Sequence, residues 1–216
     1  MKKILVFIAL CTLSAKLFAQ DCTQYFFMKK GRTIENTTYN GRGSVMHKAE
    51  MLVENVATSN GSTTATVSAQ NFDQSGNPRS KNTVTYTCNN GVLVIDMSSM
   101  MPNDGNFKFS TANFKYPPGM KVGDHFDNVT MTMQMTIGGK AMKSSTLISD
   151  RKVVDQESIT TPAGTWTCFK MTYNLTTTME GLSTPSTMMA TEWFVPNFGI
   201  VQYSMGNMVT KITAIR

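Results

Sequence analysis

A two-residue alternation rich in threonine constrains this chain more than any other feature. Apolar side chains occupy every second position, with polar residues between them, in residues 83–88, 130–137 and 169–176. Successive side chains of a strand point to opposite faces, so this pattern predicts strands with one buried and one solvated face. β-branched threonine suits the solvated face. No stretch keeps a 3.6-residue apolar period for three turns, and the pattern therefore favours antiparallel sheet over helices.

Turn residues separate the alternating runs. Asn60-Gly61, Asn90-Gly91, Gly138-Gly139, Gly206-Asn207 and Pro162-Ala163-Gly164 are typical of hairpin connections, because tight hairpin turns need positive φ angles or a preset bend. We expect about ten to twelve strands, each following the last in meander fashion.

Residues 98–128 break this pattern. They hold several prolines and glycines with little periodicity, which predicts a long irregular connection. A short helix around Met97–Met101 is the one helical element that we expect.

The first 19 residues, 1–19, are typical of a cleavable secretion signal. Lys2 and Lys3 precede a run of ten residues, 4–13, that is apolar apart from one threonine. This run fits the core of a signal peptide and is too short to span a bilayer, which needs about 20 apolar residues. Ala19 is a suitable residue for cleavage, and the mature chain would begin at Gln20.

The mature chain, 20–216, has the length of a single antiparallel β domain. The whole sequence carries 20 basic and 14 acidic residues, a net charge of +6, and loss of Lys2, Lys3 and Lys16 with the signal lowers it to +3. This weak charge argues against a nucleic-acid partner. We expect a monomer without a membrane span, exported as a soluble periplasmic or secreted protein.

Three cysteines remain after the signal: Cys22, Cys88 and Cys168. In an oxidising compartment we expect two of them to pair and one to stay a buried thiol. The sequence does not give the connectivity, but a bond from Cys22 to Cys88 has the clearest structural use, since it would fasten an otherwise loose terminus. The spacings fit no zinc site, and we expect no bound metal.

Methionine is unusually abundant, with 18 residues in the chain. Met131, Met133 and Met135 share one strand face about 6.5–7 Å apart, and Met142 lies opposite Met135 if Gly138-Gly139 is a two-residue turn. Methionine fills irregular cores and adapts to varied partners, so the group indicates core packing, or a soft surface for a lipid-like ligand or protein segment. Cu(I) is a third interpretation, because thioethers bind it.

No catalytic motif stands out. His125 lies between Asp124 and Asp127, and neighbouring carboxylates can orient a histidine as a base. A hydrolase also needs a nucleophile, and no Gly-x-Ser-x-Gly elbow occurs. We therefore expect a protein that is not an enzyme and that holds no cofactor, and keep a hydrolase using His125 as a weak alternative.

Several motifs resemble a family of exported, β-rich Bacteroidota proteins without an assigned function. They are Asp21-Cys22, Tyr86-Thr87-Cys88, Tyr116-Pro117-Pro118, Val122-Gly123-Asp124, Arg151-Lys152-Val153, residues 157–171 (ESITTPAGTWTCFKM) and residues 191–201 (TEWFVPNFGIV). The resemblance covers nearly the whole mature chain. It implies a YmcC-like fold, which is a strongly curved antiparallel sheet or an open or partly closed β-barrel, loosely similar to lipoprotein carriers. It carries no catalytic residues.

The aromatic motif at Glu192-Trp193-Phe194 precedes a tight turn, so Trp193 would either plug the end of such a barrel or line the mouth of a pocket. Together these features favour a non-catalytic envelope or secreted protein that binds an apolar small molecule, a lipid or a protein segment. The candidate ligand-facing residues are Met131, Met133, Met135, Met142 and Trp193. A structural or assembly partner at the cell surface is the alternative.

Overall fold

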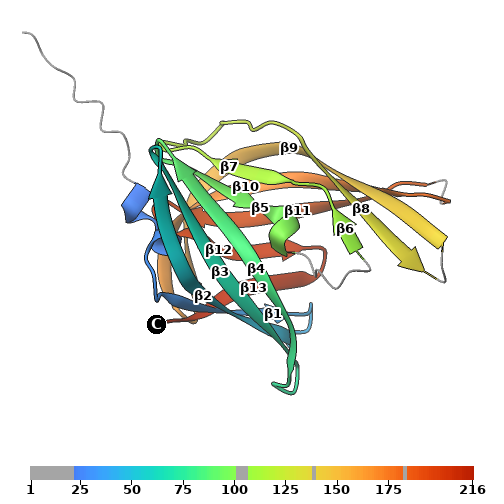
Figure 1. The fold of residues 1–216 in the computed structure, drawn as a ribbon, viewed down its shortest axis with the longest axis horizontal. Coiled ribbons are helices and arrows are strands. Elements are labelled where there is room, and N and C mark those ends of the chain that lie inside the picture. The colour runs from blue at the N-terminus through green and yellow to red at the C-terminus, as the bar shows by residue number, and fades with distance from the viewer. Residues whose placement is uncertain (1–21, 101–106, 138–139, 182–183) are drawn as a thin grey trace, which may run out of the picture.

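The computed structural model describes residues 22–100, 107–137, 140–181 and 184–216. In these residues the chain forms one 13-stranded antiparallel sheet that curls into a half-barrel (Figure 1). The all-β, strongly curved architecture expected from the sequence is confirmed. The secretion signal expected over 1–19 lies outside the described residues.

The elements follow one another along the chain, and residues 117–128 form a longer connection between β7 and β8. They are η1 Cys22–Gln24, η2 Phe26–Met28, β1 Thr33–Tyr39, β2 Val45–Ser59, β3 Ser62–Asp73, β4 Pro78–Asn89, β5 Val92–Asp96, η3 Met97–Met100, β6 Phe107–Phe109, β7 Asn113–Tyr116, β8 Val129–Ile137, β9 Lys140–Thr161, β10 Gly164–Met179, β11 Ser186–Val195, β12 Gly199–Met205 and β13 Met208–Ile215.

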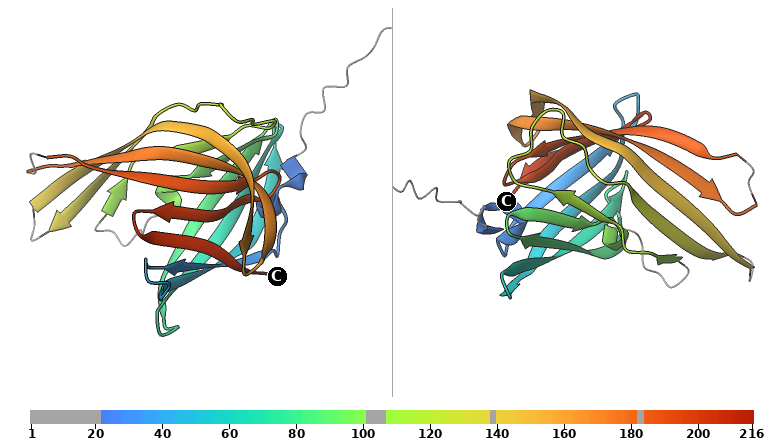
Figure 2. Two further views of the ribbon diagram at one scale, coloured as in Figure 1. Left: turned by 180° about the vertical axis from the view of Figure 1, so that it is seen from behind. Right: turned by 90° about the horizontal axis from the view of Figure 1, so that it is seen from above.

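Two meanders make up the sheet. Strands β8 to β13 pair in sequence order, strands β1 to β5 do the same, and β1 pairs with β13 to join the two runs. The short strands β6 and β7 lie at opposite ends of the sheet, beside β8 and β5. Only residues 110–112 separate them, so the chain itself connects the two ends of the curled sheet (Figure 2).

The hairpin turns occur where the sequence indicated them. Asn60 and Gly61 join β2 to β3 with φ angles of 51° and 75°, and Asn90 and Gly91 join β4 to β5 with 49° and 79°. Two successive positive φ angles match the twist of the flanking strands, and Asn-Gly tolerates them. The pair Gly138-Gly139 between β8 and β9 lies outside the described residues.

The described part of residues 98–128 has more regular structure than expected. It contains strands β6 and β7, although each is only three or four residues long. Such short strands show too little alternation to be recognised, and their pairing with β8 and β5 forms them. The expected helix is present as the 3-10 turn η3 over Met97–Met100.

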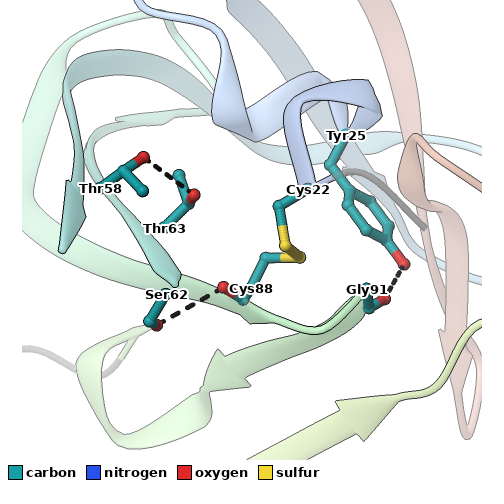
Figure 3. The surroundings of a disulfide bond; sticks show 7 residues. All are labelled: Cys22, Tyr25, Thr58, Ser62, Thr63, Cys88 and Gly91. Atoms are coloured by element: carbon teal, nitrogen blue, oxygen red, sulfur yellow. Dashed lines mark hydrogen bonds between the residues drawn. A yellow bond between two sulfur atoms is a disulfide. The ribbon is translucent and has the colours of Figure 1, made fainter. Parts of the chain in front are cut away.

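The N-terminal turns η1 and η2 close one end of the half-barrel. In η2, the ring of Phe27 stacks on Tyr86 with centroids 4.3 Å apart, and Phe26 packs against Phe198 at 4.8 Å. Cys22 and Cys88 form a disulfide, and the hydroxyl of Tyr25 donates to the carbonyl of Gly91 at 3.0 Å (Figure 3). This segment therefore packs as a plug against β4, the β4–β5 turn and the β11–β12 turn.

The remaining cysteine, Cys168, is a buried free thiol. In the part of the chain that the structure describes, no helix is long and apolar enough to cross a membrane.

Candidate functional site

A cavity of about 610 Å³ lies on the concave face of the half-barrel. Alternation along each strand turns one set of side chains inward, and these inward sets form its walls. Aliphatic, aromatic and thioether side chains together contribute most of the lining, with aromatic rings from Phe27, Tyr86, Phe114, Tyr173 and Tyr203. Its size falls within the range of about 300–1,000 Å³ that small-molecule sites occupy, and predominantly apolar walls are typical of such sites.

Methionine supplies the flexible part of this lining. Five thioethers, from Met51, Met97, Met131, Met188 and Met205, border the cavity. Unbranched, polarisable methionine side chains adapt to the shape of what they contact. Met188 is 44% exposed although it lines the cavity, so solvent reaches the interior beside it. We call this open end, opposite η2, the mouth.

A buried ion pair lies next to the cavity. The guanidinium of Arg151 on β9 is 2% exposed and donates at 3.0 Å to Oε1 of Glu192 on β11, which is fully buried. The hydroxyls of Tyr116 and Tyr173 donate to Oε2 of Glu192 at 3.2 and 3.4 Å. Arg151 also donates to the backbone carbonyl of Lys115 on β7 at 3.0 Å. The side chain of Arg151 thus bonds its own strand, β9, both to the edge strand β7 and to β11.

Aromatic rings enclose the guanidinium of Arg151. Its central carbon lies 4.6 Å from the ring centre of Phe114, 4.5 Å from Tyr116 and 4.7 Å from Phe126. Cation–π attraction of this kind is strongest when the cation is desolvated. The Nε atom of Arg151 is buried without a hydrogen-bond partner, so the rings compensate part of the lost hydration.

The protonation states in this cluster follow from burial. Burial, and next the charge of Glu192, raise the pKa of Tyr116 and of Tyr173 well above the usual value. Burial alone would lower the pKa of Arg151, but Tyr116 and Glu192 outweigh it and the pKa is raised. Near neutral pH the two phenols therefore stay protonated as donors and the guanidinium stays charged.

The four predicted methionines lie on one face of the sheet, but only one borders the cavity. Met131 lines it, while Met133, Met135 and Met142 continue the same concave face outward along β8 and β9. Met142 pairs with Met135, as the two-residue turn predicted. All four are partly buried. They form an apolar strip that leads away from the mouth, extended by Phe107 and Phe109, which pair with Met135 and Met133.

Trp193 lies on the other face of β11. Its neighbour Glu192 lines the cavity, and successive strand residues face opposite ways. The indole N–H of Trp193 donates to Glu157 at 2.6 Å, and the ammonium of Lys170 lies 5.7 Å from its ring centre. Trp193 therefore packs on the convex surface, and the end of the half-barrel is plugged by Phe27 instead.

His125 is exposed on a loop that bridges to Lys152. Among the described residues, no group of three or more His, Cys, Asp or Glu side chains is placed to hold a metal ion.

Sequence reasoning missed Arg151, Glu192 and Phe27. Both charged residues belong to motifs that carry the family resemblance, and Glu192 alternates with the buried Ala190 and Phe194. A charged residue at a core position of an alternating strand requires a partner, and that signal was available. Phe27 stands in a three-residue turn without periodicity, and nothing local marks its role.

Comparison with known proteins agrees with this fold. A crystal structure of a candidate lipoprotein from Parabacteroides distasonis has a TM-score of 0.78 at 23% identity, covering 91% of this chain and 100% of its own. A crystal structure of a candidate exported protein with a YmcC-like fold from Bacteroides fragilis has a TM-score of 0.71 at 21% identity. It covers 89% of this chain and 98% of its own. At these identities the likeness concerns the fold, and it confirms the YmcC-like architecture.

A search of curated proteins finds no match. A family model described as DUF3108-like matches residues 29–211. This match spans both meanders, from the end of the N-terminal plug to β13, and so includes the strands that line the cavity. The chain belongs to the DUF3108-like family.

Proposed function

We propose that this chain is an exported, non-catalytic protein that binds an apolar ligand in the concave cavity of its half-barrel. The observation that carries the proposal is the cavity itself, about 610 Å³ in volume and lined mainly by aliphatic, aromatic and thioether side chains. Apolar ligands gain free energy in proportion to the apolar area they remove from water. Such a site selects its ligand by shape and hydrophobicity more than by charge.

The charge distribution of the cavity supports a non-catalytic role. Among the described residues that line the cavity, Glu192 carries the one formal charge, and Arg151 and two phenols already bind it. The charge of Glu192 is therefore already compensated. This suits storage or transport of a neutral molecule better than acid–base chemistry.

Export is supported by three independent observations. Residues 1–19 have the pattern of a secretion signal, the Cys22–Cys88 disulfide suits an oxidising compartment, and the structural neighbours are described as a candidate lipoprotein and a candidate exported protein.

Binding can be tested with N-phenyl-1-naphthylamine, an uncharged dye that fluoresces in apolar sites. Ala49 on β2 lines the cavity, whereas Ala57 on the same strand is exposed. Ala49→Phe fills the cavity and weakens dye binding about tenfold or more, because overpacking costs about 1–3 kcal/mol. Ala57→Phe leaves binding unchanged. Failure of the wild-type protein to bind the dye, or equal binding by both variants, would contradict the proposal.

A second candidate function is assembly with a protein partner at the cell surface. It rests on Met189 of β11, which is 64% exposed and faces away from the cavity, because its neighbour Met188 lines it. Replacing Met189 with serine would abolish co-purification of such a partner from envelope extracts without affecting the melting temperature. If the variant and the wild type retain the same proteins, Met189 is not part of a docking surface.

A further inference from the structure

The five methionines that line the cavity differ in their access to solvent. Met188 on β11 is 44% exposed, whereas Met51 is only 7% exposed. Met97, Met131 and Met205 lie between these two extremes. Dissolved oxidants convert the thioether of methionine to a sulfoxide, and exposed side chains react first. Among the cavity methionines that the structure describes, Met188 is therefore the one that an oxidant in solution reaches most readily.

Met188 belongs to an apolar row at the mouth. It pairs across strands with Leu175 on β10, which in turn pairs with Ile148 on β9, and all three side chains line the cavity. The next row along these strands holds Thr146 and Thr177, whose hydroxyls hydrogen-bond to each other at 2.9 Å. A ligand that fills the cavity as far as the mouth therefore contacts the thioether of Met188 together with two aliphatic side chains.

We propose that Met188 is a site of oxidation by peroxides, and that its sulfoxide weakens the binding of an apolar ligand in the cavity. The sulfur attacks one oxygen of hydrogen peroxide, and the O–O bond breaks as the S–O bond forms. The second oxygen takes up the proton of the first and leaves as water. Sulfur is thereby oxidised by two electrons and the peroxide is reduced by two. This inference rests on the proposed function and adds a modification site that regulates it.

The sulfoxide changes the chemistry of the mouth. Its oxygen is polar and accepts hydrogen bonds, so packing it against an apolar ligand costs free energy. If the side chain turns to solvent instead, the ligand loses its contact with Met188. Loss of about 40 Å² of apolar contact, at about 25 cal/mol per Å², weakens binding about fivefold. Either response lowers the affinity for an apolar ligand.

Met189 provides a control within the same strand. It is 64% exposed and pairs with Asn174 on β10. As the neighbour of Met188 it points to the opposite, convex face of the sheet. An oxidant therefore reaches Met189 at least as readily, but the sulfoxide formed there lies outside the cavity. The two methionines thus separate the effect of oxidation in the cavity from the effect of oxidation on the surface.

Peptide mapping by mass spectrometry tests the site of oxidation. The folded, full-length mature protein is treated with hydrogen peroxide, and the uptake of oxygen at each methionine is followed with time. Fragment ions distinguish Met188 from Met189. Both should gain oxygen faster than Met51 and Met131, because both are more exposed. A Met188 that reacts no faster than the buried Met51 would overturn the inference.

Binding of N-phenyl-1-naphthylamine before and after peroxide treatment tests the consequence. Treatment should weaken dye binding about fivefold or more in the wild type and in Met189→Leu. Met188→Leu has no sulfur at the mouth, and its binding should be the same after treatment as before. Unchanged binding by wild-type protein that is fully oxidised at Met188, or an equal loss in Met188→Leu, overturns the inference. Absence of dye binding by the untreated wild-type protein would instead refute the proposed function.

Discussion

Replacing Arg151 with methionine tests the ion pair that connects β7, β9 and β11. Arg151 and Glu192 are 2% and 0% exposed, and their charged atoms lie 3.0 Å apart. Removing the guanidinium leaves a carboxylate in the interior with two phenol donors and no positive charge. Breaking a buried pair in this way costs about 3–5 kcal/mol. For a chain of this size that corresponds to a fall of about 6–20 °C in melting temperature.

The double variant Arg151→Met with Glu192→Leu separates the pair from the rest of the packing. Apolar residues of similar volume in place of a buried pair are often neutral or stabilising, so the double variant should be more stable than Arg151→Met alone. The aromatic contacts of Arg151 with Phe114, Tyr116 and Phe126 are lost in both variants and cancel in the comparison.

Equilibrium unfolding in urea, followed by circular dichroism, measures these differences if the m-value stays constant. A loss below about 1 kcal/mol in Arg151→Met, or a double variant as destabilised as the sum of the two single changes, would refute the reasoning. Either result would mean that the cluster is not desolvated as its burial indicates.

Three further predictions concern other parts of the molecule. Loss of the Cys22–Cys88 disulfide through Cys22→Ser and Cys88→Ser should lower the free energy of unfolding by about 2–4 kcal/mol, because the bond spans 66 positions; an unchanged thermal melt would contradict this. Burial, and next the charge of Glu157, raise the pKa of Cys168 to about 11, so at pH 8 a thiol reagent should label it only after unfolding, and rapid labelling of the native protein would be inconsistent. Burial raises the pKa of Tyr86, Tyr116 and Tyr173 above the unfolded value near 10, so the unfolded state loses these protons first. Stability should be constant below about pH 9 and fall by up to about 1.4 kcal/mol per pH unit for each phenol above pH 10, and urea titrations showing a flat profile to pH 12 would argue against their burial.

Local patterns were enough to predict the strands and many of their turns. The alternation in residues 83–88 and 169–176 identified β4 and β10, and Asn60-Gly61 and Asn90-Gly91 placed two hairpins. These signals are contained within a few neighbouring residues. The pairing of Met135 with Met142 follows in the same way, from one hairpin connection.

The closure of the half-barrel depends on contacts that are remote in sequence. Pairing of β1 with β13, and the bond from Arg151 to the carbonyl of Lys115, join segments that no local pattern relates. The outward position of Trp193 follows from the register of β11, which the buried Glu192 fixes. A single large aromatic residue could not reveal which face of its strand would be concave.

A crystal structure of the protein soaked with a brominated alkyl chain would test the central claim most directly. The account predicts an anomalous bromine peak inside the cavity, between the rings of Phe27 and Tyr86 at the closed end and Met188 at the mouth. A bromine peak confined to the convex surface near Trp193, or a cavity that stays free of the probe at saturating concentration, would contradict it.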